Sequence, residues 1–406
     1  MTTQPRRGNR DLIKAMNRNL ILNILRGHGP LSRSQLTELS GLSVGAVSQI
    51  TSALITENWI KEDGEGDYTG GRRQTMLRLN PTAGHVIGIK LMEQRIVTVL
   101  TDLETTPLAY LERPLPSAQS PEVVIEGLRG VIDGILAASG VSRSRVVGVG
   151  IGLAGVIDYD RGIVHYSPYF HWRDVPLADI LSTQIGLPVY IENDVNSLTL
   201  TEQLFGAGHE VANFVVVTVG RGIGMGMVFN HQRYQGTRGG AGELGHITVE
   251  SNGLPCDCGK FGCLEAMAAD PAVFRYVEQA LAQGIASRVR PPITLQRVVD
   301  AAREGDELAR SALSRSGRYL GMGLATVINI LSPSLIVLSG EGVIAEDYRL
   351  QSTMEALHEH TFDGLLDNVR IVVKPADEEL WARGAAGLVV GKVFESPLLT
   401  PLTQDA

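Results

Sequence analysis

All three cysteines of this 406-residue chain lie between positions 256 and 263, and a histidine precedes them. His246 is followed after nine residues by Cys256, and Cys258 and Cys263 complete a His-x9-Cys-x-Cys-x4-Cys pattern. Three thiolates and one imidazole form the ligand set of a tetrahedral structural zinc site. The alternative is a chance cluster of buried free thiols. A catalytic zinc would keep one position for water, so this closed set argues against zinc hydrolysis and predicts an ion, Zn²⁺, that fixes a loop.

Side chains rich in hydrogen-bond acceptors surround this pattern. "GELGH" places Glu243 three residues before His246, "CLE" places Glu265 two residues after Cys263, and "ENDVN" supplies Asn193 and Asp194. Carboxylates and an amide that meet in a cleft can bind the hydroxyl groups of a sugar. Taken singly, each acid is more often a surface residue or a helix cap.

The elements that would position these residues follow an α/β pattern from Pro81 onward. Apolar runs that end in glycine turns, such as "VVGVGIGLAGVID", "NFVVVTVGRGIGMGMVFN" and "SLIVLSGEGV", indicate buried strands. Helical segments, such as "PEVVIEGLRGVIDGILAASG", separate them. This alternation predicts a ligand cleft at the ends of the strands.

The first 80 residues differ from the rest in charge and in pattern. They contain 11 Lys and Arg against 7 Asp and Glu, a net charge of +4, whereas the whole chain carries −8. A basic head on an acidic body fits a head that meets a polyanion. Its first helix is expected at 11–29, with an apolar stripe formed by Ile13, Met16, Leu20 and Ile24.

Two further short helices and a hairpin complete the expected head. Ser32 and Ser43 are plausible N-caps, and Gly41 suits the tight turn between the two helices. The outer face of the second of these helices is small and hydrogen-bonding, as a helix in a DNA major groove requires, although such side chains can also merely be solvated. The wing carries "GGRR", which could lie along phosphates or in a minor groove, or could be a charged linker. The candidate DNA-binding residues are Arg33, Ser43, Gly45, Ser48, Gln49, Ser52, Arg72 and Arg73.

Composition favours an ordinary globular protein without a membrane span. Hydrophobic residues make up 44% of the chain and charged residues 20%. The longest weakly polar run is short and broken by glycines, and "MTTQPRRGNRD" lacks the apolar core of a signal peptide. We therefore expect a cytoplasmic protein, in which clustered thiols stay reduced.

Residues 82–397 resemble the ROK family of sugar-responsive repressors and sugar kinases, through "GVGIGLAGVID", "ENDVN", "GELGH" and the His-Cys loop. With its winged head and "GGRR", the chain resembles the repressor branch typified by xylose-operon and N-acetylglucosamine regulators. The resemblance implies an α/β protein: a winged helix-turn-helix at 1–80, then a two-lobed actin-like, sugar-kinase-like body. Its lobes would be 81–196, joined by a last helix at 380–397, and 197–379 with the zinc loop.

The resemblance to the ROK family also implies a sugar site and a zinc site. Asn193, Asp194, Glu243, His246 and Glu265 would line the sugar site, and His246, Cys256, Cys258 and Cys263 would hold zinc. His246 can serve both sites only if one ring nitrogen binds metal and the other faces the ligand.

One departure from the family's kinases bears on activity. Their first-strand loop reads Asp-x-Gly-Gly-Thr, whereas this chain has Lys90 in place of the Asp and Met92, Glu93 and Gln94 in the glycine stretch. These side chains would block the approach of phosphates, on whose positioning phosphoryl transfer depends. Asp194, which matches the kinases' general base, and the glycine-rich 220–226 are retained. Lys90 is therefore predicted to fill the vacated cation position and to pair with Asp194.

These features together predict a non-enzymatic, sugar-responsive repressor that binds operator DNA. A homodimer would match a palindromic operator, with a tetramer as the alternative, and sugar binding would change the angle between the lobes. Two other interpretations remain: a repressor controlled by a protein partner, and an active sugar kinase with a DNA-binding head.

Overall fold

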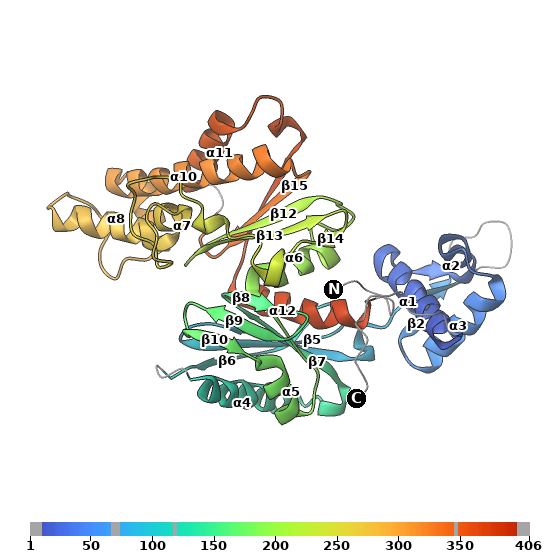
Figure 1. The fold of residues 1–406 in the computed structure, drawn as a ribbon. Coiled ribbons are helices and arrows are strands. Elements are labelled where there is room, and N and C mark those ends of the chain that lie inside the picture. The colour runs from blue at the N-terminus through green and yellow to red at the C-terminus, as the bar shows by residue number, and fades with distance from the viewer. Residues whose placement is uncertain (1–9, 66–73, 117–119, 345–347, 396–406) are drawn as a thin grey trace.

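The computed structural model describes residues 10–65, 74–116, 120–344 and 348–395, and it shows a small head beside a larger body (Figure 1). The head contains three helices and a three-stranded antiparallel sheet of order β1-β3-β2. This arrangement confirms the predicted winged helix-turn-helix; Arg72 and Arg73 lie outside the described residues. The helices are α1 (Arg10–His28), α2 (Arg33–Ser40) and α3 (Val44–Thr56), and the strands are β1 (Leu31–Ser32), β2 (Ile60–Glu65) and β3 (Thr75–Leu79).

The turn between α2 and α3 forms as its residue types require. Ser32 and Gln35 make a reciprocal capping box at the start of α2, and the Ser43 side chain accepts the amide N–H of Ala46 at the start of α3. Gly41 ends α2 with φ of 66°, a conformation that glycine adopts without strain.

The apolar stripe expected for α1 is wrong at Ile13 and Leu20, whereas Ile24 is partly buried and packs against the core of the head. Ile13 is 52% exposed and Leu20 39%, whereas Ile21, Leu22 and Leu25 are buried. The stripe misplaced the core because only the C-terminal half of α1 packs, both within the head and against the last helix of the body, α12 (Glu378–Val393).

The first sheet of the body has the order β11-β7-β4-β5-β6, with β11, β7 and β4 parallel and the other pairs antiparallel. Helices α4 and α5 lie on one face and α12 on the other (Figure 1). Close packing of α12 depends on Gly88 and Gly150, where a Cβ would overlap the carbonyl oxygens of Ala382 and Ala385. The strands are β4 (His85–Leu91), β5 (Arg95–Thr101), β6 (Pro107–Pro114), β7 (Val146–Leu153) and β11 (Val189–Asn193); the helices are α4 (Pro121–Ser139) and α5 (Leu177–Ile185). A small antiparallel sheet contains β8 (Val156–Asp158), β9 (Ile163–Ser167) and β10 (Trp172–Val175).

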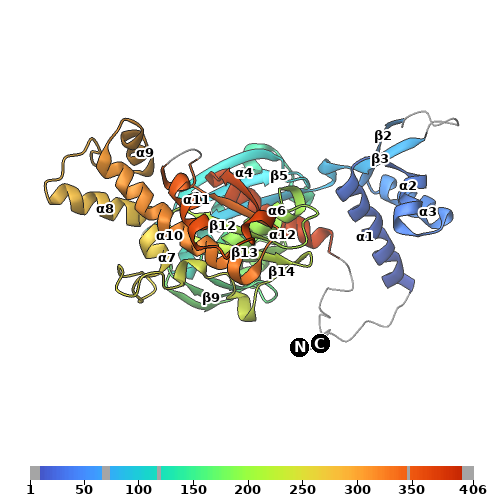
Figure 2. The same cartoon turned by 90° about the horizontal axis from the view of Figure 1, so that it is seen from above.

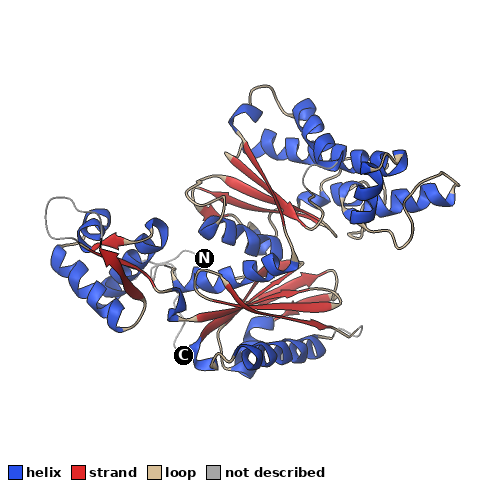
Figure 3. Cartoon of the chain, turned by 180° about the vertical axis from the view of Figure 1, so that it is seen from behind, coloured by secondary structure: helices blue, strands red, loops and turns tan. Residues whose placement is uncertain are grey.

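The second sheet repeats the pattern of the first, with order β14-β13-β12-β15-β16 and parallel pairing of β12, β15 and β16. Two such sheets with helices between and outside them confirm the predicted two-lobed α/β body (Figure 3). The strands are β12 (Phe214–Val219), β13 (Ile223–Phe229), β14 (Gln232–Arg233), β15 (Leu335–Gly340) and β16 (Arg370–Pro375). The helices are α6 (Asp194–Phe205), α7 (Leu264–Ala268), α8 (Asp270–Ala282), α9 (Leu295–Arg303), α10 (Glu307–Leu331) and α11 (Tyr348–His360). Short 3₁₀ turns occur at Pro81–Ala83, Arg143–Arg145, Thr237–Gly239, Leu244–His246 and Leu366–Asn368.

Helices α6 and α12 lie against each other between the two sheets, and the C-terminal end of α12 points toward the head (Figures 1 and 2). Within the described ranges no single helix combines the length and apolar character needed to cross a membrane, although α2 and α3, taken together as a pair bent by 118°, do so by length and composition.

Candidate functional site

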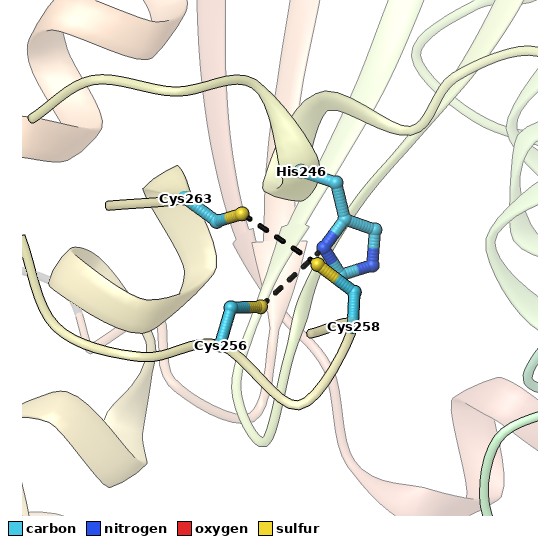
Figure 4. Close-up of side chains that lie close together, drawn as sticks. All are labelled: His246, Cys256, Cys258 and Cys263. Carbon is cyan, nitrogen blue, oxygen red and sulfur yellow. Dashed lines mark hydrogen bonds between the residues drawn. The ribbon is translucent and has the colours of Figure 1, made fainter. Parts of the chain in front are cut away.

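The structure brings His246, Cys256, Cys258 and Cys263 together. Their nitrogen and sulfur atoms all lie within 4.8 Å of one another. The Cys256 Sγ is 3.7 Å from His246 Nδ1, and the Sγ atoms of Cys258 and Cys263 are 3.7 Å apart (Figure 4). A zinc tetrahedron has edges of about 3.5–3.8 Å, because Zn–S is about 2.3 Å and Zn–N about 2.0 Å. These four residues can therefore hold a metal ion.

The loop that carries the cysteines is folded tightly. Residues Thr248 and Cys263 form an antiparallel bridge, and at Gly262, with φ of 66°, a Cβ would overlap the carbonyl oxygen of Glu250. Burial raises the pKa of the Cys256 thiol to about 12. A metal ion bound at this sulfur would favour its thiolate form.

His246 connects the cysteine cluster with an acidic site. Its Nδ1 faces Cys256, while its Nε2 lies 3.7 Å from the Glu243 carboxylate. The imidazole ring is therefore oriented so that Nδ1 can bind a metal ion while Nε2 faces the acidic residues.

The predicted carboxylates Asp194, Glu243 and Glu265 lie close enough for their charges to affect the pKa of Glu243. Burial raises the pKa of Glu243; the nearby His246 opposes this shift, and the charges of Glu265 and Asp194 add to it. Asp194 begins α6 at the end of the first sheet, whereas Glu243 and Glu265 belong to the second lobe. The charges of Asp194 and Glu265 thus act on the Glu243 carboxyl group, although Asp194 follows the first sheet and the other two residues belong to the second lobe.

Asn193 and Asp194 already have protein partners. The Asn193 side-chain oxygen caps α6, and its Nδ2 donates to the Gly155 carbonyl at 3.1 Å. Asp194 forms an ion pair with Lys90, whose ammonium also lies 4.5 Å from the centre of the Trp381 ring. The Lys90–Asp194 pair expected from the sequence is therefore present.

In the glycine-rich segment 220–226, which comprises the turn between β12 and β13 and the start of β13, two backbone N–H groups donate to carboxylates. The amide N–H of Arg221 donates to Glu341 at 3.0 Å, and that of Ile223 donates to Glu265 at 3.0 Å. A Cβ at Gly220 would overlap the Glu341 carboxyl group. Sequence analysis did not find Glu341, although its place in "LSGEGV" after a predicted strand was a usable signal.

A further aromatic contact near the acids was also missed. Tyr169 lies with its ring 5.6 Å from the Arg221 guanidinium. Burial raises its pKa to about 12, and the charges of Asp194 and Glu265 act in the same direction. No spacing rule singles out this tyrosine, because its loop meets the site only in the folded chain.

On the head, the outward face of α3 is polar and open. Gly45, Ser48, Gln49 and Ser52 are exposed, whereas Ser43 is also used as the helix cap. Arg33 is half-buried, and its Nε donates to Thr51 Oγ1 at 3.1 Å, so it joins α2 to α3.

Val44 is a further candidate on this helix. It is 72% exposed on the first turn of α3 and was not predicted from sequence. Apolar side chains at this place can contact a thymine methyl group.

Comparison with known proteins agrees with the division of the chain into a winged helix-turn-helix head and a larger body. Residues 17–61 match the model described as winged helix-turn-helix DNA-binding, and residues 86–392 match the model of the ROK family. The chain belongs to the ROK family. This ROK protein is 30% identical to a putative xylose repressor of Caldicellulosiruptor sp., over 96% of its own length and 99% of that protein. It is 32% identical to the Escherichia coli K12 regulator NagC over 98% of both chains.

Solved structures resemble the whole chain or its body. A ROK transcriptional regulator described as a homologue of E. coli MLC superposes with a TM-score of 0.84 at 27% identity, covering 96% of this chain and 98% of that one. A ROK glucokinase from Streptomyces griseus, in complex with glucose and AMPPNP, gives 0.66 at 28% identity and covers 75% of this chain and 99% of that one. The fold therefore occurs both in regulators and in kinases.

Proposed function

We propose that this ROK protein is a sugar-responsive transcriptional repressor whose body binds a sugar without phosphorylating it. The observation that carries the proposal is the occupation of the turn 220–226 by this chain's own carboxylates. A nucleotide phosphate at that turn would have to displace Glu341 and Glu265 and would be repelled by them. The kinase-like site would therefore retain the sugar-binding half and lose the nucleotide-binding half.

The sugar would bind at Asn193, Asp194, Glu243, His246 and Glu265. Hydroxyl groups would donate to the carboxylates, while Tyr169 would add an apolar ring face. Asp194 would act as a hydrogen-bond acceptor only. Its partner in the structure is the ammonium group of Lys90.

Zinc is the metal that we propose for His246 and the three cysteines, because soft thiolates with one imidazole in a compact tetrahedron suit it. When bound, it would supply structural cross-linking and no chemistry. Because Cys256 lies beside both His246 and Glu265, the ion would hold these two proposed sugar-site residues in place.

Operator binding would use α3 of the head and the wing, with Gln49 and Ser48 reading base edges and Arg72 and Arg73 contacting the DNA backbone or minor groove. Two heads on a homodimer would fit a palindromic site, and this function would place the protein in the cytoplasm. The domains that we propose are the DNA-binding head at 1–80, the first lobe at 81–196 with 380–397, and the second lobe at 197–379.

The test is sugar-dependent DNA binding. Duplexes selected from a random library by the full chain would be titrated with D-xylose, N-acetyl-D-glucosamine and its 6-phosphate, using fluorescence anisotropy, with ATP consumption followed in parallel. We expect one sugar to change the DNA affinity without ATP consumption. Consumption of ATP that requires sugar would favour a kinase, and unchanged DNA affinity with every sugar would favour control by a protein partner.

A further inference from the structure

The Tyr159 ring contacts two cations that belong to different parts of the body. It follows β8, and its ring centre is 5.1 Å from the guanidinium of Arg233 and 4.9 Å from the ammonium of Lys392. Arg233 ends β14 of the second sheet, whereas Lys392 is in the last turn of α12. A single aromatic ring thus joins the second lobe to the end of α12.

On the second-lobe side, this contact continues to β11, the strand that leads into the proposed sugar-site residues Asn193 and Asp194. Arg233 Nη1 lies 3.3 Å from Glu192 Oε2, and the Gln235 side chain also donates to Glu192. Glu192 is fully buried on β11, two residues before Asp194. A movement of β14 relative to the first sheet would therefore change the contacts of Arg233 with both Glu192 and Tyr159.

On the other side, the end of α12 holds the DNA-binding head. Asn23 of α1 donates to the Phe394 carbonyl at 2.9 Å, and Asn19 donates to that of Glu395. The Arg26 guanidinium lies 4.9 Å from the Phe394 ring centre. Lys392 in turn pairs with Glu395 at 2.8 Å. The residue that contacts Tyr159 is thus tied to the segment on which α1 docks.

We propose that Tyr159 is a positioning residue that couples the arrangement of the two lobes to the docking of α1 on α12. When the second lobe moves, Arg233 loses its contact with the Tyr159 ring. The contact between Tyr159 and Lys392 then weakens, and α1 docks less firmly on the end of α12. A coupling of this kind requires a two-state element that both regions bias, and in this proposal that element is α1, either docked on α12 or released from it. The inference rests on the proposed function only for the nature of the signal, because the contacts themselves involve no sugar.

The experiment is amide hydrogen exchange of the full-length, sugar-free protein. We compare the wild type with Tyr159→Leu, which removes the aromatic face, and Tyr159→Phe, which keeps it. Loss of two cation–π contacts should speed exchange in the protected part of α1, residues 21–25, by roughly five- to thirtyfold, whereas Tyr159→Phe should change it by less than about twofold. The matched control is Tyr166→Leu, since Tyr166 makes a similar contact with Arg173, 5.0 Å away, within the small sheet.

A second variant approaches the ring from the other lobe. Arg233→Gln leaves α1 and α12 intact, and it should speed exchange in α1 in the same direction as Tyr159→Leu. If Tyr159→Leu and Arg233→Gln alter exchange only around β8 and β14 and leave α1 as in the wild type, the coupling is refuted. Equal acceleration of α1 by Tyr166→Leu would also refute it. Failure of every sugar to bind would overturn the proposed function and leave this result unaffected.

Discussion

Replacing Lys90 by methionine tests whether this lysine stabilises a buried ion pair in the place of a kinase's metal and phosphates. The side chains of Lys90 and Asp194 are 11% and 13% exposed, so solvent screens the pair only slightly. Removal of one partner from a buried pair costs about 3–5 kcal/mol, because it leaves the other charge without compensation. Asp194 would keep the Val195 amide N–H as a partner and some contact with water. We therefore expect a loss of about 2–3 kcal/mol in the free energy of unfolding.

The assay is urea unfolding of wild type, Lys90→Met, Asp194→Asn and the double variant at neutral pH. The double-mutant cycle should give a coupling energy of about 2 kcal/mol. Arg318→Met is the control, because Arg318 and Glu359 form a pair whose side chains are 61% and 54% exposed. Its loss should cost less than about 1 kcal/mol. A coupling between Lys90 and Asp194 below about 0.5 kcal/mol would refute the reasoning.

Three further outcomes follow from the structure. Purified protein should contain one zinc per chain by atomic absorption, and Cys256→Ser should remove it and lower the unfolding midpoint, whereas retained zinc would contradict the assigned ligands. Gly262→Ala should destabilise the protein more than Gly259→Ala. Both glycines have positive φ, but of the two only Gly262 has a backbone oxygen where the added Cβ would lie. Equal thermal midpoints of the two variants would contradict this. Gln49→Ala should weaken binding to the selected duplex by about 1–3 kcal/mol and relax specificity at one base pair. The control variant Gln35→Ala should leave the specificity unchanged. Unchanged specificity in Gln49→Ala would exclude base readout by Gln49.

Features set by short spacing were predictable from the sequence. The cysteine cluster depends on a local loop, and its four residues converge as expected. The capping box of Ser32 and Gly41 at the helix end likewise depend on neighbouring residues. The Lys90–Asp194 pair joins distant segments, but comparison with the kinases' loop indicated which position had changed charge.

Contacts made only by the folded chain were not predictable in this way. Tyr169 reaches the site from a loop that carries no distinctive spacing. Glu341 follows a predicted strand, but its contact with the Arg221 amide forms only in the folded chain. The stripe of α1 was misassigned because helical periodicity gives an apolar face without saying what covers it. Ile21 and Leu25 are buried partly by Val390 and Phe394 of the distant C-terminal segment.

The most direct test of a sugar sensor without kinase activity is thermal unfolding of the zinc-loaded chain with D-glucose, D-xylose, N-acetyl-D-glucosamine and its 6-phosphate. A ligand that prefers the native state stabilises it by about 2.7 kcal/mol at one hundred times its Kd. We predict that one of these sugars raises the unfolding midpoint of the wild type, that Asp194→Ala abolishes this shift, and that added ATP is not consumed. An unchanged midpoint with every sugar, or ATP consumption that requires the sugar, would contradict the account.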